Sequence, residues 1–207
     1  MGGNIRQGAL FLASESARRR ELLARLGLEF VVSVSGVDED LIEGASAART
    51  AEMRARAKAW AVASTVKSGL VLAADTVIEL CDADLGKTDS AEVARRILTL
   101  ISGKHCSAVT ALTLLEVRSS GVASERSSTV RSEIWMKPYG SDRIDEYVRT
   151  GEFQGRAGAF AIQGLGGDLV ESWHGCFYNI VGLPLCEVAR LVGESQDEPI
   201  PADCRHG

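Results

Sequence analysis

The residues from Gly69 to Leu80 most constrain how this chain can fold. They are apolar apart from a few positions, which predicts a buried β-strand, and we expect Asp75 and Thr76 to interrupt it. A carboxylate among apolar neighbours costs free energy unless it is paired or bound to a cation. Because ligands of open α/β sheets collect at strand ends, Asp75 is a candidate metal ligand or general base. The alternative, an acid that caps a turn, fits an interrupted strand less well.

The rest of the chain alternates between strand and helix patterns. Apart from Gly69–Leu80, we expect strands over Ala9–Ala13, Phe30–Val34, His105–Val117 and Ser128–Met136. We expect helices after the caps Ser14 and Ser16 up to Gly27, over Ala47–Ser64, from a capping box at Asp89–Glu92 to Ile101, and over Ser141–Thr150 and Leu183–Val192. The polar segment Arg118–Ser127 is predicted as a hairpin loop. This pattern predicts an α/β or α+β domain.

Composition excludes several classes of partner. The 207 residues carry a formal net charge of −5 without a basic tract, so we expect no nucleic acid. No apolar run approaches the roughly 20 residues that span a bilayer, and the first residues lack a signal-peptide core. The five cysteines include no Cys-x-x-Cys pair, which favours reduced thiols. We therefore expect a cytoplasmic protein without membrane contact, with a single domain over 1–193 and a frayed tail over 194–207.

One candidate phosphate site combines hydroxyls and guanidinium groups at a helix start. Ser14, Ser16, Arg18 and Arg19 follow the first predicted strand. A helix N-terminus presents free N–H groups and a positive dipole end, and arginine matches phosphate geometry. A solvated helix cap with surface arginines explains the residues equally well. The position directly after a strand favours the phosphate interpretation.

Other polar residues are individually weak candidates. Asp38 with Glu39, then Lys58, Lys87 and Gln163, are scattered between the predicted elements, and each could be an ordinary surface residue. The triplet that starts at Gly86 imitates the end of a P-loop, but Cys81 stands where that motif requires glycine. The sequence also lacks the Gly-x-Ser-x-Gly elbow of a serine hydrolase. Both of these alternatives are therefore disfavoured.

Taken in order, the motifs resemble those of the Maf-like nucleotide pyrophosphatases, also called septum-formation-inhibitor-like proteins. They run in that family's order from residue 12 to residue 185. The matching segments are Leu12–Arg19, Val37–Glu39, Ala57–Ala59, Ala74–Val77, Gly86–Lys87, Ser102–His105, Ala157–Gly164 and Asn179–Leu185.

The resemblance implies an elongated α/β fold like that of inosine triphosphate pyrophosphatases. Its mixed sheet is flanked by helices, and a nucleotide cleft lies between two lobes of a homodimer subunit. It also implies attack of water on the α-phosphorus of a nucleoside triphosphate, assisted by Mg²⁺ or another divalent cation such as Mn²⁺. Asp75 matches the family's proposed proton acceptor, and with Glu39 it is an expected metal ligand. The expected substrate-binding residues are Ser14, Arg18, Arg19, Lys58, Thr76, Lys87 and Gln163.

Two departures from the family pattern leave an alternative open. Lys87 is followed by Thr88 where the family often has proline, and Gly155-Arg156 replaces an Asp-Lys pair, so a positive charge remains but an acid is lost. If that acid holds metal or water, Glu152 or Asp38 would have to replace it. Gln163 and its neighbours resemble the branch that acts on dTTP and UTP, and modified pyrimidine nucleotides fit as well. The alternative is a non-catalytic nucleotide-binding regulator of cell division and septum formation.

Overall fold

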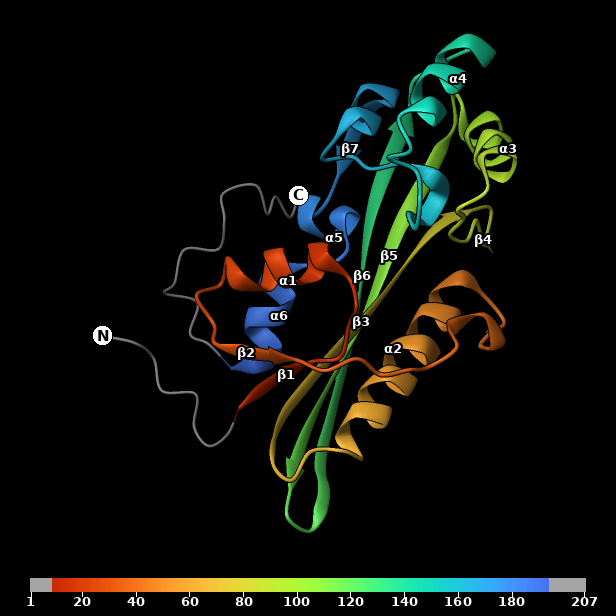
Figure 1. The fold of residues 1–207 in the computed structure, drawn as a ribbon. Helices are drawn as coiled ribbons and strands as arrows, with labels where there is room; N and C mark the ends of the chain where they lie inside the picture. The colour runs from red at the N-terminus through yellow and green to blue at the C-terminus, as the bar shows by residue number, and fades with distance from the viewer. Residues whose placement is uncertain (1–8, 194–207) are drawn as a thin grey trace.

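A single mixed sheet runs along the length of the molecule (Figure 1). The computed structural model describes residues 9–193. Strand order is β2-β1-β3-β5-β6-β7, with β4 paired to β3; β1 is parallel to β2 and β3, and the pairs from β3 to β7 are antiparallel. The strands are β1 Leu10–Leu12, β2 Phe30–Val32, β3 Gly69–Leu80, β4 Ala83–Asp84, β5 His105–Arg118, β6 Gly121–Met136 and β7 Val170–His174.

The central strand β3 does not break at the two polar residues in its middle. Asp75 pairs with Ala111 and Thr76 with Thr110 in the antiparallel register with β5. The expected interruption is therefore wrong. Neighbouring residues of a strand point to opposite faces of the sheet, so the two side chains enter different environments. Both find polar partners there, and this lets an apolar strand carry them without breaking.

The hairpin predicted between the two long strands is present, but its loop is much shorter than the expected Arg118–Ser127. Strand β6 begins at Gly121, which pairs with Arg118, so only residues 119 and 120 separate β5 from β6. The partner β7 pairs with β6 only from Glu133 onwards. The first half of β6 is therefore an edge strand with largely exposed side chains, and an edge strand accommodates polar residues that a buried strand would exclude.

Helices cover the two faces of the sheet unevenly. The face that carries Val77 packs on α2, whereas the opposite face, which carries Leu72, packs on α1 and α6. Further along that second face, α3 and α4 pack around Ile78. The helices are α1 Ala17–Ala24, α2 Ala47–Ala63, α3 Ala91–Ile101, α4 Ser141–Arg149, α5 Phe177–Val181 and α6 Leu185–Val192, with short 3₁₀ turns η1 Glu39–Leu41, η2 Ala157–Ala159 and η3 Leu165–Leu169.

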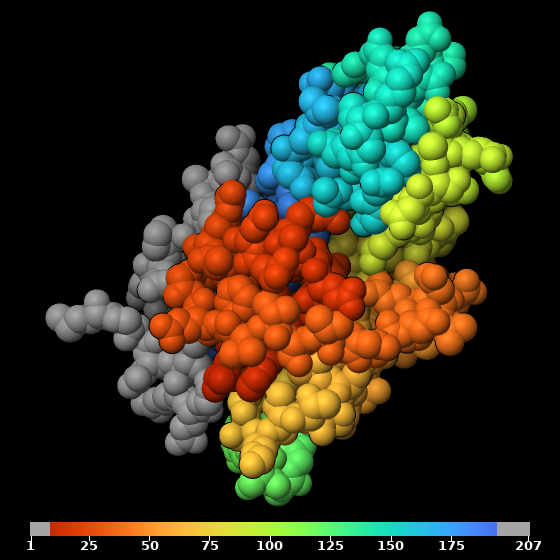
Figure 2. All heavy atoms as spheres, in the orientation of Figure 1, coloured from red at the N-terminus to blue at the C-terminus, as the bar shows by residue number. Residues whose placement is uncertain are grey.

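Helices α1, α2 and α6 form one lobe of the molecule, and α3 and α4 form the other. The space-filling surface recedes into a hollow between the two lobes (Figure 2). The predicted α/β class, a mixed sheet flanked by helices, is confirmed. At finer scale, Ser90 rather than Asp89 caps α3, and β4, β7 and α5 were not predicted. The expected tail over 194–207 lies outside the described residues. Among those described, no helix is both long enough and apolar enough to cross a membrane.

Candidate active site

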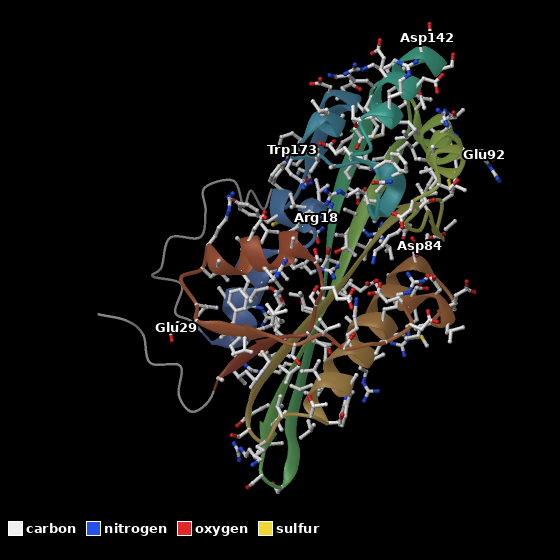
Figure 3. The ribbon with its side chains drawn as sticks, in the orientation of Figure 1. Arg18, Glu29, Asp84, Glu92, Asp142 and Trp173 are labelled. Carbon is white, nitrogen blue, oxygen red and sulfur yellow. The ribbon has the colours of Figure 1, made fainter. Side chains whose placement is uncertain are left out.

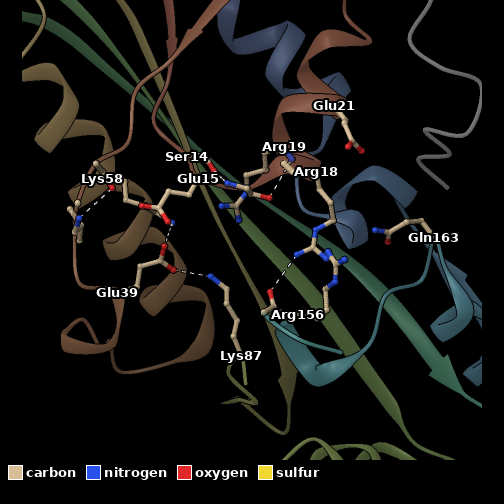
Figure 4. A pocket seen from close by; sticks show the side chains of 16 residues that line it. Ser14, Glu15, Arg18, Arg19, Glu21, Glu39, Lys58, Lys87, Arg156 and Gln163 are labelled. Carbon is tan, nitrogen blue, oxygen red and sulfur yellow. Dashed lines mark hydrogen bonds and ion pairs between the residues drawn. The ribbon is translucent and has the colours of Figure 1, made fainter. Parts of the chain in front are cut away.

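The hollow between the lobes is an open cavity of about 600 Å³. Its walls come from the start of α1, the segment 35–39, α2, the loop before α3, and the segment 155–163 (Figure 4). Most of the predicted site residues meet here although they are far apart in the sequence. Those that line the cavity are Ser14, Arg18, Arg19, Glu39, Lys58, Lys87 and Gln163.

The start of α1 is built as the sequence predicts. Ser16 is the N-cap, and its hydroxyl accepts the N–H of Arg19 at 3.4 Å, while the hydroxyl of Ser14 accepts the N–H of Ser16 at 3.2 Å. The chain therefore enters the helix with both serines facing the cavity. Arg18 lies between the two lobes (Figure 3), and its Nη2 donates to the carbonyl of Gly155 at 3.5 Å (Figure 4). This contact joins the two lobes.

Arg19 has a more structural position than Arg18. It is buried, and its Nε donates to the carbonyl of Gly182 at 3.0 Å while its Nη2 donates to Thr76 Oγ1 at 3.2 Å. That hydroxyl also lies 2.9 Å from the hydroxyl of Thr110. Thr76 therefore belongs to a buried polar network on the α1 face of the sheet. It lines a smaller adjoining cavity that Gln163 also borders.

Three charged residues on the floor of the main cavity and a fourth beneath it are called here the carboxylate–lysine cluster: Glu39, Lys58 and Lys87 on the floor, and Asp75 below. Lys58 Nζ donates to Asp75 Oδ1 at 2.8 Å and to Glu39 Oε1 at 3.2 Å. Lys87 Nζ donates to Glu39 Oε2 at 2.8 Å and lies 3.9 Å from Asp75 Oδ1. Each carboxylate thus contacts both ammonium groups, and the four formal charges cancel.

Burial and neighbouring charge act against each other in this cluster. Burial alone would raise the pKa of Glu39, but the charges and hydrogen bonds of Lys58 and Lys87 outweigh it and lower the pKa to about 2. For Lys58, burial lowers the pKa, and the carboxylate of Asp75 opposes that shift. The lysine side chain is only 3% exposed. Small residues of α2, including Ala55 and Ala59, pack closely on the sheet and bring Lys58 to Asp75.

Asp75 lies below the cavity rather than on its wall. Its side chain is fully buried, and its second oxygen, Oδ2, has no hydrogen-bond partner. A buried carboxylate oxygen without a partner is costly and points to a ligand or a water that completes it. No group of three or more histidine, cysteine or acidic residues suited to a metal occurs within residues 9–193. Within the carboxylate–lysine cluster, the candidate metal ligands are the carboxylates of Asp75 and Glu39.

Neither acid proposed as a substitute at position 155 faces the cavity. Asp38 accepts the N–H of Asp40 at 3.1 Å and caps the turn η1. Glu152 accepts backbone N–H groups of the segment after Gln163. Arg156, in contrast, lines the cavity and was missing from the predicted site. The sequence did point to Arg156, because it keeps the positive charge of the Asp-Lys pair that Gly155-Arg156 replaces.

The chain is similar to known proteins over most of its length. The model of the "Maf-like protein" family matches residues 9–195. The "dTTP/UTP pyrophosphatase" of Desulforamulus reducens is 40% identical over 180 residues, 87% of this chain and 93% of that protein. The "dTTP/UTP pyrophosphatase" of Methanococcoides burtonii is 41% identical over 184 residues, 88% and 93% of the two chains.

One solved structure also shows a limited similarity. It is the crystal structure of a "Nucleoside-triphosphatase / dITP/XTP pyrophosphatase" from Mycobacterium abscessus, with a TM-score of 0.42 and 18% identity over 62% of this chain and 74% of that one. A similarity at this level carries no argument about the site. The family model and the curated relatives, in contrast, match most of the chain. The chain belongs to the Maf-like protein family.

Proposed function

We propose that this protein hydrolyses nucleoside triphosphates to a nucleoside monophosphate and pyrophosphate, with dTTP, UTP or modified pyrimidine nucleotides as substrates. The curated relatives at about 40% identity carry the name dTTP/UTP pyrophosphatase, which supports this substrate class. The geometry adds support of its own. A triphosphate needs a cleft with several cations, and this cleft contains them on both sides.

The observation that carries the proposal is a buried carboxylate beneath a cationic cleft. Lys58 and Lys87 stand on the floor, and Arg18 and Arg156 stand toward the other lobe. Together these groups suit the charge of a bound triphosphate, and the two lysines suit that of the leaving pyrophosphate. Asp75 lies 2.8 Å from Lys58 Nζ, directly under that charge. A water molecule near the phosphates would thus have a carboxylate base within reach.

In the proposed reaction, Asp75 accepts a proton from the attacking water. Water needs a base or a metal to become a nucleophile near neutral pH. The new bond joins the water oxygen to the α-phosphorus, and the bond from that phosphorus to the bridging oxygen breaks, so that pyrophosphate leaves. Lys58 and Lys87 now hold the carboxylates, and phosphate oxygens would compete for them. Substrate binding would in this way release Asp75 for proton transfer.

The chain's donors suit Mg²⁺ or Mn²⁺ at the same place. Asp75 Oδ2 lacks a partner, and Glu39 lies on the other side of Lys58. Magnesium is commonly bound through one or two carboxylates together with substrate phosphates, so Asp75 and Glu39 are sufficient protein ligands. When bound, the cation would neutralise phosphate charge and polarise the attacked phosphate.

We expect the protein to be a cytoplasmic homodimer. Light scattering on the purified protein would test the oligomeric state.

The reaction is tested by resolving its products. Purified protein with Mg²⁺, Mn²⁺ or chelator is offered dTTP, UTP, CTP, GTP, ATP and a 5-modified pyrimidine triphosphate, and the products are separated by ion-exchange chromatography. We expect dTMP or UMP with pyrophosphate, only in the presence of the divalent cation. Diphosphate with orthophosphate would mean cleavage at the γ-phosphate and would reject the proposal.

The role of Asp75 is tested by Asp75→Asn, which keeps the shape of the side chain but removes its basicity. We expect kcat to fall by about a factor of 10³, within the usual range for loss of a general base. The control is Asp40→Asn, because Asp40 is an exposed acid of the neighbouring turn η1. Unchanged activity in Asp75→Asn would reject this mechanism. Tight dTTP binding without turnover in the wild type would favour the non-catalytic regulator of division.

A further inference from the structure

Glu152 makes a contact that the reaction does not require. It lies in the turn after α4, and its carboxylate accepts two backbone N–H groups, that of Leu165 at 3.0 Å through Oε1 and that of Gly166 at 2.8 Å through Oε2. These residues follow Gln163 by two and three positions. Gln163 itself is exposed on the cleft wall. The carboxylate therefore holds the backbone of the segment that presents Gln163.

The same residue also holds the second cleft residue on this side. The backbone carbonyl of Glu152 accepts the Nε of Arg156 at 3.1 Å. Arg156 and Gln163 both line the main cavity (Figure 4), and both also line the smaller adjoining one. Glu152 thus fixes one cleft residue through its main chain and the other through its side chain, while its own side chain does not line either cavity.

The glycines beside Gln163 fit closely around this contact. A Cβ on Gly164 would collide with the Glu152 carboxylate, and a Cβ on Gly166 would lie 2.9 Å from the hydroxyl of Tyr147. That hydroxyl accepts the N–H of Ala161 at 3.1 Å, so it anchors the other end of the same segment. Gly164 has φ −120°, outside the left-handed region that favours glycine, so the lack of space for a Cβ is what favours glycine here.

We propose that Glu152 is a positioning residue for nucleobase recognition: it sets the place of Gln163 and Arg156 at the end of the cleft away from the carboxylate–lysine cluster. This rests on the proposed function. The ligand class is the base of a pyrimidine nucleoside triphosphate, whose carbonyl and N–H edge a glutamine amide can match with one donor and one acceptor. The acid at 152 therefore does not replace the lost acid at 155, since it acts on backbone amides rather than on metal or water.

The test compares dTTP and UTP kinetics of the wild type, Glu152→Gln and the control Glu146→Gln. Glutamine offers one acceptor oxygen and an NH₂ group, so one of the two backbone N–H groups would face a donor. We expect KM to rise about tenfold in Glu152→Gln, with kcat within about twofold of the wild type. Glu146 is an exposed acid of α4 paired with Arg143, and its replacement should change neither constant.

Two further measurements separate positioning from a general loss of structure. Inhibition by pyrophosphate should stay within about twofold in Glu152→Gln, because pyrophosphate would bind at the lysine end of the cleft. Combining Glu152→Gln with Gln163→Ala should raise KM little beyond Gln163→Ala alone, because residues that act through one another are not additive. Full additivity, or equal weakening of pyrophosphate and dTTP, would overturn the proposal.

If Glu152→Gln does not fold, Gly164→Ala tests the same contact with the acid in place. The added methyl group would displace the carboxylate, and we expect the same rise in KM with kcat retained. An unchanged KM in a folded Gly164→Ala protein would overturn the proposal. Turnover by the wild type tests the proposed function separately. If the wild type binds dTTP without cleaving it, the dTTP dissociation constants of the variants are measured by calorimetry in place of KM. The same comparison of variants then decides the role of Glu152.

Discussion

The two sides of the cleft are stabilised in opposite ways. On the α2 side, the carboxylate–lysine cluster pairs side chain with side chain, with Lys58 and Asp75 buried and Glu39 and Lys87 partly exposed. The opposite side, residues 155–166, is called here the backbone-held side. There the Glu152 carboxylate accepts backbone N–H groups, and the side chain of Gln163 remains exposed to the cleft. The first arrangement saturates charges before any substrate arrives, whereas the second fixes positions and leaves the recognising group exposed.

The difference assigns a task to each side. A triphosphate carries enough charge to compete for Lys58 and Lys87, so a cluster held by ion pairs can rearrange when it binds. A nucleobase is uncharged, and its recognition gains most from groups that are already in place. We therefore expect chemistry and stability to depend on the cluster, and substrate choice to depend on the backbone-held side. The predictions below test this division from the largest effect to the smallest.

The largest expected effect comes from Lys58→Met. The substitution leaves the buried Asp75 carboxylate without its closest cation, and breaking a buried ion pair in this way typically costs about 3–5 kcal/mol of unfolding free energy. Turnover should be lost as well. Urea denaturation at pH 7 measures the change. Adding Asp75→Asn should restore most of the stability, because the uncompensated charge is then gone.

Arg156→Met is the matched control on the other side of the cleft. Arg156 is only partly buried and donates to a backbone carbonyl, so its loss leaves no buried charge, and we expect a cost below about 1 kcal/mol. Equal losses of stability from Lys58→Met and Arg156→Met would mean that the two sides are not stabilised differently. The proposed division of tasks between the two sides of the cleft would then be rejected.

A middle-sized effect is expected from Glu39 and should depend on pH. Its folded pKa of about 2 lies below the usual 4.5, so Glu39 stabilises the folded state fully above pH 4.5, and this contribution is lost as the pH falls toward 2. Because the side chain is about a third exposed, solvent screening reduces the contribution to about 1 kcal/mol. Urea midpoints of wild type and Glu39→Gln should differ at pH 7 and converge as the pH falls below 4.5. A difference that stays constant between pH 7 and 3.5 would contradict this assignment.

The chemistry of the cluster was more predictable than its geometry. Asp75 attracts attention because it is an acid within an apolar strand, and that signal is purely local. Its partners Glu39, Lys58 and Lys87 are ordinary polar residues whose meeting depends on how α2 and the loop before α3 pack. The sequence did allow one geometric prediction. Because Asp75 and Thr76 are neighbours in a strand, their side chains must face opposite sides of the sheet.

The backbone-held side was much less predictable. Gln163 was only a weak candidate until the family resemblance gave it a substrate-binding role, and the contact of Glu152 depends on the conformation of a loop without regular periodicity. The polar start of β6 was likewise missed, since exposure at a sheet edge removes the apolar alternation that marks a strand. Periodic apolar residues in a sequence indicate which side chains are buried. The start of β6 and the loop that Glu152 contacts both have few buried apolar side chains, so the sequence gives no such pattern there.

The smallest expected effect on turnover is that of Gly155→Asp, which returns the family's acid to the backbone-held side. Gly155 has φ +61°, a conformation that disfavours side chains but tolerates Asp better than most, and no atom lies within 4 Å of a Cβ there. We expect a loss of about 1 kcal/mol in unfolding free energy and a change in kcat/KM below about threefold. Gly155→Ala, with similar backbone strain but no carboxylate, is the control.

The outcome of Gly155→Asp tests the division between the two sides most sharply. If the carboxylate–lysine cluster supplies all the acid chemistry, Gly155→Asp and Gly155→Ala should have the same kcat, because a carboxylate beside Arg18 has no role in proton transfer. A tenfold higher kcat in Gly155→Asp alone would show that the backbone-held side also takes part in chemistry in this chain. Since Glu152 and Asp38 are both engaged with backbone N–H groups, that role would then be unfilled in the natural sequence.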